Sequence, residues 1–154
     1  MKRLHVHISV DDLSASKRFY SALFGQGPSV EKPDYAKWAI DDPRVNLSVS
    51  EKPDRAPGLN HLGIQAESDG ELDELHDRLA EASVAMRDQP GAQCCYARSD
   101  KHWATDPQGI VWELFRTMGE VATYGENRAM TAPTQERAAH EGAREGAQAQ
   151  GCCC

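Results

Sequence analysis

The segment His5-Val6-His7-Ile8-Ser9-Val10 decides the fold, because His61-Leu62-Gly63-Ile64-Gln65-Ala66 repeats its pattern 56 residues later (61 − 5). In both segments apolar residues alternate with the others, which is the period of a β-strand. The two histidines open equivalent strands. Each strand therefore has an apolar face for helix packing and an opposite face that displays its histidine.

An amphipathic helix is predicted after each of these strands. The first covers Leu13–Phe24, between an N-cap at Asp12 and a C-terminal Gly25. The second covers Glu71–Ala82, where apolar residues recur at helical spacing: Leu72, Leu75, Leu79 and Ala82. The two halves of the chain therefore begin alike, with a strand followed by a helix.

Short apolar segments after each helix predict the remaining strands: Tyr35–Ile40, Val45–Ser50, Gln93–Arg98, Lys101–Thr105 and Val111–Arg116. Asp42-Pro43 and Asp106-Pro107 mark a turn before the last strand of each half. The order of elements predicts an α+β fold with two β-α-β-β-β modules, at about residues 1–52 and 58–117.

Residues 118–154 differ from this body in composition. Ala, Glu, Gly, Gln, Arg and Thr dominate, without apolar periodicity. Such a segment buries too little surface to offset its ordering entropy. We therefore predict one domain over residues 1–117 and a disordered tail over 118–154 that ends in Cys152-Cys153-Cys154.

The composition and net charge of the chain limit the kinds of partner that it is expected to bind. The chain has 154 residues, is 40% hydrophobic, and carries a net charge of −7 (17 − 24). This favours one ordinary globular domain and gives no basic face for nucleic acid or anionic lipid. Neither a signal peptide nor a long apolar segment is visible, so we expect a cytoplasmic protein with no membrane partner.

A metal site is predicted where the equivalent strands meet. A pseudo-twofold arrangement of the modules would bring His5 and His61 together. Glu113 lies inside an apolar segment, where a buried charge is costly unless it is paired or bound to a cation. Two imidazoles and a carboxylate suit the Fe(II) of oxygenases and also catalytic zinc.

Other interpretations of these residues stay open. His7 shares a strand face with His5 and competes as the first ligand, while Glu113 can also be explained by pairing with an Arg or Lys. We expect neither His76, on the exposed side of a helix, nor His102, beside Trp103, to be a ligand.

Cys94 and Cys95 form a second candidate site. Successive side chains of a regular strand point to opposite faces, so both sulfurs reach one atom only from a loop or bulge, which nearby Pro90 and Gly91 favour. Two close thiolates suit soft ions such as trivalent arsenic, antimony or cadmium. The alternative is a pair of ordinary reduced thiols. Residues 152–154 either capture the same kind of ion or form a dispensable end.

The order His-x-x-Ile-x-Val-x-Asp-Leu-x-x-Ser-x-x-Phe-Tyr, from His5 to Tyr20, resembles the opening of the vicinal oxygen chelate superfamily. This superfamily includes glyoxalases, extradiol dioxygenases and bleomycin resistance proteins. The resemblance implies two modules in a cupped mixed sheet around a divalent metal. The ligand positions correspond here to His5, His61 and Glu113.

A more specific resemblance rests on Cys94-Cys95-Tyr96-Ala97, Asp100-Lys101, Trp103 and the segment from Asp106 to Glu113. It is to the branch of organoarsenical carbon–arsenic lyases and cadmium-induced proteins. It implies an Fe(II)- and O2-dependent enzyme that converts trivalent organoarsenicals to arsenite, with arsenic held by Cys94 and Cys95. Lys101 and Tyr96 are candidates to assist the thiolates, although surface or packing roles explain them equally.

Two other functions remain open from the sequence. One is a heavy-metal binding or resistance protein without lyase activity. The other is a thiol-dependent transferase or isomerase, although Val45–Ser50 offers no carboxylate to match Glu113. Whichever function applies, the acidic charge and the paired modules favour a homodimer.

Overall fold

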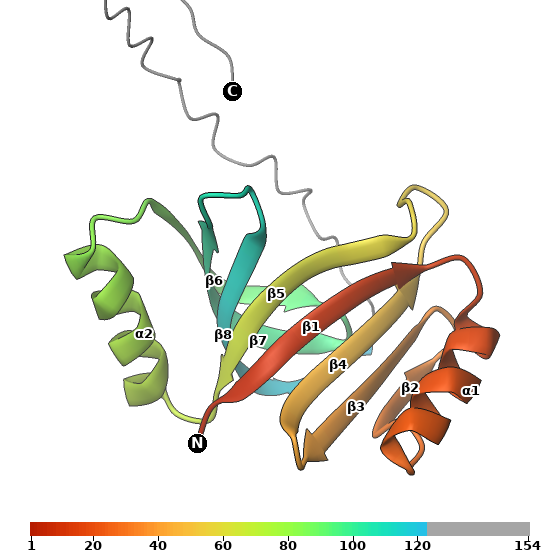
Figure 1. Ribbon diagram of the computed structural model, residues 1–154. Coiled ribbons are helices and arrows are strands. Elements are labelled where there is room, and N and C mark those ends of the chain that lie inside the picture. Colours follow the sequence, from red (N-terminus) through yellow and green to blue (C-terminus); the bar gives the residue numbers. More distant parts are fainter. Residues whose placement is uncertain (123–154) are drawn as a thin grey trace, which may run out of the picture.

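The computed structural model describes residues 1–122 and shows one eight-stranded mixed sheet with two helices on its outer side (Figure 1). The elements in chain order are β1 (Arg3–Val10), α1 (Leu13–Phe24), β2 (Val30–Lys32), β3 (Tyr35–Asp41), β4 (Arg44–Glu51), β5 (Gly58–Ala66), α2 (Asp69–Glu81), β6 (Met86–Cys94), β7 (Ala97–Thr105) and β8 (Val111–Glu120). The predicted α+β class is confirmed.

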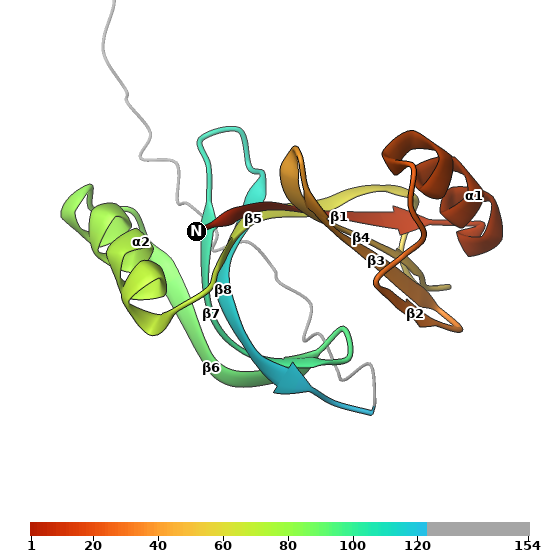
Figure 2. The ribbon, with the colours of Figure 1, turned by 90° about the horizontal axis from the view of Figure 1, so that it is seen from below.

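The strand order is symmetric about the centre of the sheet. It runs β2-β3-β4-β1-β5-β8-β7-β6, with β1 and β5 antiparallel in the middle. On either side, β4 is parallel to β1 and β8 is parallel to β5. Figure 2 shows the sheet curled into an open half-barrel. The predicted cupped sheet of two β-α-β-β-β modules is therefore confirmed, and the histidine strands lie side by side at its centre.

The outer face of the sheet holds the apolar core. Under α1, the core includes Trp38 and Val49, and Val6 and Ile8 of β1 pack against it. Under α2, a smaller cluster contains Ala66, Leu72 and Leu114. The alternating faces predicted for the two histidine strands are present, since their apolar side chains pack towards the helices.

The inner face of the sheet is polar and yet buried. Its strands carry buried His5, His7, Ser9, Asn46, Ser48, Ser50, His61, Ser99, Lys101 and Glu113. Buried polar groups are costly unless they are hydrogen-bonded or bind a ligand. A set of this size on one concave face therefore makes the inside of the cup the candidate functional region.

Several element boundaries differ from the prediction. Helix α1 is as predicted, but α2 begins at Asp69, because the Ser68 side chain accepts a hydrogen bond from the Glu71 backbone N–H at 3.2 Å. The three-residue β2 was not predicted. Strand β8 continues to Glu120, so residues 118–120, expected in the tail, belong to the sheet. The rest of the predicted tail, with Cys152–Cys154, lies almost wholly outside the described residues.

The predicted strand Gln93–Arg98 is wrong. Cys94 ends β6, Ala97 begins β7, and the two strands form an antiparallel hairpin. Cys95 and Tyr96 make the turn with φ values of 53° and 62°, in the left-handed region that non-glycine residues seldom adopt. Neither helix of the described part of the chain is long and apolar enough to span a membrane.

Candidate functional site

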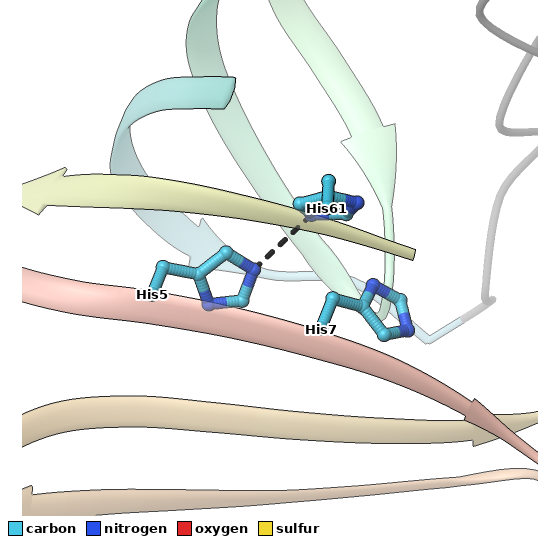
Figure 3. A group of neighbouring side chains, drawn as sticks. All are labelled: His5, His7 and His61. Atoms are coloured by element: carbon cyan, nitrogen blue, oxygen red, sulfur yellow. Dashed lines mark hydrogen bonds between the residues drawn. The ribbon is translucent and has the colours of Figure 1, made fainter. Parts of the chain in front are cut away.

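Three of the predicted site residues converge inside the cup. His5 on β1 and His61 on β5 bring their Nε2 atoms to 3.2 Å, across the antiparallel centre of the sheet (Figure 3). Oε2 of Glu113, on β8, lies 3.5 Å from Nε2 of His5 and 3.3 Å from Nε2 of His61. All three side chains are buried. Three donor atoms from three strands thus surround one point.

The hydrogen bonds behind these atoms set the proton positions. His5 Nδ1 lies 3.0 Å from the backbone carbonyl of Asn46, and His61 Nδ1 lies 2.7 Å from Oδ1 of Asn60. An oxygen of this kind only accepts, so each Nδ1 carries the hydrogen and donates it. In the neutral rings both Nε2 atoms then present lone pairs. Such outer hydrogen bonds are typical of metal-binding histidines.

Charge supports the same arrangement. Burial lowers the pKa of His5 to about 4, which keeps the ring neutral at pH 7. Burial on its own raises the pKa of Glu113, but the neighbouring charge of Lys101 holds it well below the ordinary value. With both rings neutral and protonated on Nδ1, the cup contains a carboxylate facing two lone pairs. This combination calls for a cation.

The spacing of the three donors fits a metal ion. Bonds of about 2.0–2.2 Å at angles of about 90–110° hold donor atoms about 3.0–3.5 Å apart. The three separations of 3.2, 3.3 and 3.5 Å lie in that range. They are long for ordinary hydrogen bonds. The residues present therefore fit a divalent ion with coordination positions left open towards the cavity.

His7 is the alternative third donor. A ring nitrogen of His7 lies within 4.8 Å of donor nitrogens of His5 and His61, and Figure 3 shows the three rings together. Its Nε2, however, is 2.8 Å from Oγ of Ser50, and it contributes no negative charge. The two possible sets share His5 and His61. Glu113 lies within 3.5 Å of both shared nitrogens and supplies the charge.

The cysteine pair lies at the same cavity. The turn after β6 turns both side chains to it, and Cys94 and Cys95 line it together with His5, His61 and Glu113. The cavity volume of ≈ 40 Å³ is enough for an ion together with further small ligands. Because Cys95 lies in a turn and not in a regular strand, the side chains of both cysteines can face the same cavity. Both cysteines are free thiols, Cys94 buried and Cys95 half-buried.

Lys101 on β7 connects the two donor sets. Its Nζ donates to Sγ of Cys94 at 2.7 Å and to Oε1 of Glu113. Burial on its own lowers the pKa of Lys101, but the charges of Glu113 and the cysteines raise it above the ordinary value. The ammonium group therefore stays charged inside the cup. Lys101 fixes the position of the sulfur relative to the carboxylate.

The thiols differ in charge. A hydrogen bond from Cys95 lowers the pKa of Cys94 to about 6, against burial and with help from Lys101. The hydrogen bond to Cys94, together with burial, raises the pKa of Cys95 well above its ordinary value. At pH 7 the pair holds one thiolate and one thiol. Thiolate is the nucleophilic and metal-binding form of cysteine.

Sequence reasoning found some of these residues and missed others. Lys101 was singled out only for its proximity to the cysteines, and its contact with Glu113 depends on the pairing of β7 with β8. Asn60 was missed although it directly precedes His61. Asn46 acts through its backbone carbonyl, which no residue type reveals. His76 and His102, predicted not to be ligands here, lie outside the cup on α2 and β7.

Comparison with known proteins gives matches along most of the chain. The model of the Glyoxalase/Bleomycin resistance protein/Dioxygenase superfamily matches residues 2–114. A protein named cadmium-induced protein CadI, from Mycobacterium tuberculosis, is 38% identical over 125 residues, 81% of this chain and 82% of the relative. A trivalent organoarsenical cleaving enzyme from Bacillus sp. (strain MD1) is 38% identical over 144 residues, 90% of this chain and 89% of the relative.

Solved structures share the fold at lower identity. Homoprotocatechuate 2,3-dioxygenase from Brevibacterium fuscum superposes with a TM-score of 0.57 at 18% identity, covering 79% of this chain and 38% of that chain. The Mn(II)-bound glyoxalase from Novosphingobium aromaticivorans gives a TM-score of 0.55 at 18% identity, covering 83% of this chain and 44% of that chain. At these identities the likeness concerns the fold alone.

Proposed function

Because the chain belongs to the glyoxalase/bleomycin resistance protein/dioxygenase superfamily, we propose that its cup is the active site of a metal-dependent carbon–arsenic lyase. The substrates would be trivalent organoarsenicals, methylated or arylated, and the product arsenite. One observation carries the proposal: Lys101 joins a Cys94 thiolate to Glu113, so that a soft donor pair and a hard donor set face one cavity. The name of the Bacillus relative supports the choice of substrate.

His5, His61 and Glu113 would hold the metal, and Fe(II) is the ion we propose. Imidazole and carboxylate ligands with open positions are the set used by non-haem Fe(II) oxygenases. When bound, Fe(II) supplies activation of dioxygen, the oxidant that the cleavage requires. The chain's own part is to orient the two imidazole rings through Asn46 and Asn60 and to keep Glu113 ionised through Lys101.

Cys94 and Cys95 would bind the arsenic. The Cys94 thiolate attacks As(III), and Cys95 adds the second sulfur. Each As–S bond replaces one As–O bond: one hydroxyl group of the arsenical leaves as water with the proton of the Cys95 thiol, and the other leaves as hydroxide, which takes a proton from solvent. Two As–S bonds leave the organic group as the third substituent. Lys101 would then fix the distance from the bound arsenic to the metal ligands.

Aromatic side chains complete the site. Trp103 meets the ring of His61 edge-on at 5.4 Å, and Phe115 meets that of His5 in the same way at 5.1 Å. These contacts restrict rotation of the imidazoles and keep water from their sides. A dry, fixed donor set strengthens the electrostatic interactions within it.

The test is arsenic speciation. Anaerobically purified, Fe(II)-loaded protein is incubated with a trivalent methylarsenical, with and without oxygen. Oxygen-dependent release of inorganic arsenite is the expected result, lost in Glu113→Ala and in the Cys94→Ala, Cys95→Ala double variant. Methylarsenical that stays intact while bound, in the presence of both iron and oxygen, would refute the lyase.

A second candidate function is heavy-metal binding without lyase activity. The specific observation in its favour is the vicinal pair itself, together with the cadmium-induced relative. A binding protein would keep its affinity for cadmium in Glu113→Ala and lose it in the double cysteine variant. A thiol-dependent transferase or isomerase is less well supported, because Ser48 stands on β4 where Glu113 stands on β8.

We further propose that the protein acts as a cytoplasmic homodimer without a nucleic acid or membrane partner. The net charge of −7 argues against both of these partners. Light scattering of the eluting protein tests the oligomeric state, and a monomer would refute that part.

A further inference from the structure

A second group of metal-binding side chains lies on the outer face of the sheet. His76 on α2, Asp88 on β6 and His102 on β7 each offer a donor atom, and these atoms all lie within 4.8 Å of one another. The rings of His76 and His102 are 4.7 Å apart between centroids. His102 lies between Lys101 and Trp103 in β7, so its side chain leaves the strand on the side away from the cup. The group is separate from the central site.

Three different elements position this group. Asp88 and His102 are cross-strand partners in the β6–β7 ladder, and their side chains meet on the same face. Helix α2 lies outside the curl of the sheet in both views (Figures 1 and 2) and brings His76 to them. The side chains of His76 and His102 are 33% and 19% exposed, so an ion from solvent can reach them.

The hydrogen bonds of the histidines are compatible with binding of a cation. Nδ1 of His102 lies 2.8 Å from Oδ1 of Asp88, near the separation of about 3.0 Å that two donors take on one metal ion. A cation between them would replace the shared proton. Nδ1 of His76 lies 3.3 Å from Oδ1 of Asp77; when the neutral ring donates from Nδ1, its Nε2 presents a lone pair to an ion.

We propose that His76, Asp88 and His102 form a second metal site for a borderline divalent cation such as Zn²⁺. Two imidazoles and a carboxylate are a common zinc ligand set, with water in the remaining position. No sulfur donor belongs to this group, so it does not share the preference of the cysteine pair for soft ions. The exposed Asp88 can rotate to shorten the donor separations.

The ion would tie α2 to the β6–β7 hairpin. The helix packs chiefly on β5 and β8 through Leu72, Ala66 and Leu114. Beside this contact is an apolar cavity of ≈ 380 Å³, with Leu79, Ala104 and Trp112 among its lining residues. A metal link across this side would hold the helix where side-chain packing is incomplete. Its role is therefore structural and is independent of the proposed lyase activity.

Zinc titration of the full chain tests the site. Calorimetry and bound-zinc analysis are run on a Cys152→Ser, Cys153→Ser, Cys154→Ser background and on the same background with His76→Ala and His102→Ala. The double histidine variant should bind one zinc fewer per chain, and Asp88→Asn should bind that zinc at least about tenfold more weakly. Asp73→Asn, an equal charge change on α2, is the control and should leave both zinc equivalents unchanged.

A stability readout separates this site from the cup. Zinc should raise the melting temperature in the Glu113→Ala variant, which removes a proposed central ligand, and this increase should vanish when His76→Ala and His102→Ala are added. Equal zinc uptake and an equal temperature shift with and without the two histidines would overturn the proposal. Asp88→Asn provides the same comparison if the double variant does not fold.

Discussion

The two halves of the sheet place a hydrogen-bonded side-chain pair at equivalent positions, one neutral and one charged. In the first half, the Tyr35 hydroxyl on β3 lies 2.8 Å from Oγ of Ser48 on β4. In the second half, Lys101 on β7 donates to Glu113 on β8. The parallel ladders show the equivalence, because Ser48 is paired with His7 and Glu113 with Gly63. The same backbone arrangement thus carries a neutral hydrogen-bonded pair in the first half and a charged pair in the second half.

The two halves also differ in the room for a side chain between the paired parallel strands. A Cβ atom at Gly63 would lie 2.3 Å from the backbone oxygen of Glu113, so the second half requires a glycine there. In the first half, the residue that corresponds to Gly63 is His7, which pairs with Ser48 on β4. The close approach of β5 to β8 is what brings the carboxylate towards His61. The halves therefore differ in packing as well as in charge, and each difference can be tested separately.

Glu113→Gln should have the largest effect, because it removes the negative charge from the second half while keeping the size of the side chain. We expect Fe(II) affinity and arsenite release to fall by at least about 100-fold, more than the loss of an outer hydrogen bond causes. Fe(II) titration and arsenic speciation measure the two quantities.

Ser48→Ala is the matched control in the first half and should change both quantities little. If Glu113→Gln instead kept its Fe(II) affinity, His7 would be the third ligand. His7→Ala would then show the large loss, and the reactive half would be the first one.

Gly63→Ala tests the difference in packing. The added methyl group must displace the β8 backbone, so the free energy of unfolding should fall by about 2 kcal/mol. Urea denaturation measures it. Gly119→Ala, also in the sheet, meets nothing within 4 Å and should change the free energy of unfolding by less than about 0.5 kcal/mol. Equal effects of the two substitutions would show that β5 and β8 are not closely packed.

The contrast between the halves explains what sequence could predict. Strand alternation and helical spacing are local, so the two modules and the pairing of His5 with His61 followed from the repeat. The role of Lys101 did not, because it depends on which strand lies beside β8. The turn at Cys95 and Tyr96 was predicted only in part: a loop or bulge at the cysteine pair was expected from Pro90 and Gly91, but its position was not. Two non-glycine residues with positive φ have no recognisable turn signature, and the segment Gln93–Arg98 was predicted as a strand.

Lys101→Met tests how much the charge in the second half activates the thiol. The pKa of Cys94 is about 6, below the free-cysteine value of about 8.5. The Cys94 thiolate therefore predominates above about pH 6 and disappears as the pH falls through about 6. Without the ammonium group the midpoint should rise above 6, so the fraction of thiolate at pH 7 should fall. Ultraviolet absorbance of the thiolate against pH measures it.

Lys101→Arg keeps the positive charge and should keep the Cys94 midpoint closer to that of the original protein. A midpoint that stays near 6 in Lys101→Met would assign the activation of Cys94 to Cys95 alone. Lys101 would then serve only to position Glu113 and keep it ionised.

Tyr35→Phe removes the equivalent hydrogen bond of the first half and should have the smallest effect. The buried Tyr35 hydroxyl bonds Ser48, whose own hydroxyl lies 3.5 Å from Oδ1 of Asn46 as a second partner. The free energy of unfolding should therefore fall by only about 1 kcal/mol, measured by urea denaturation. The Cys94 midpoint should not move, because no charge is lost. A shift of that midpoint comparable to the one in Lys101→Met would show that the neutral pair of the first half also affects the pKa of Cys94. The two halves would then not differ in their effect on the thiol.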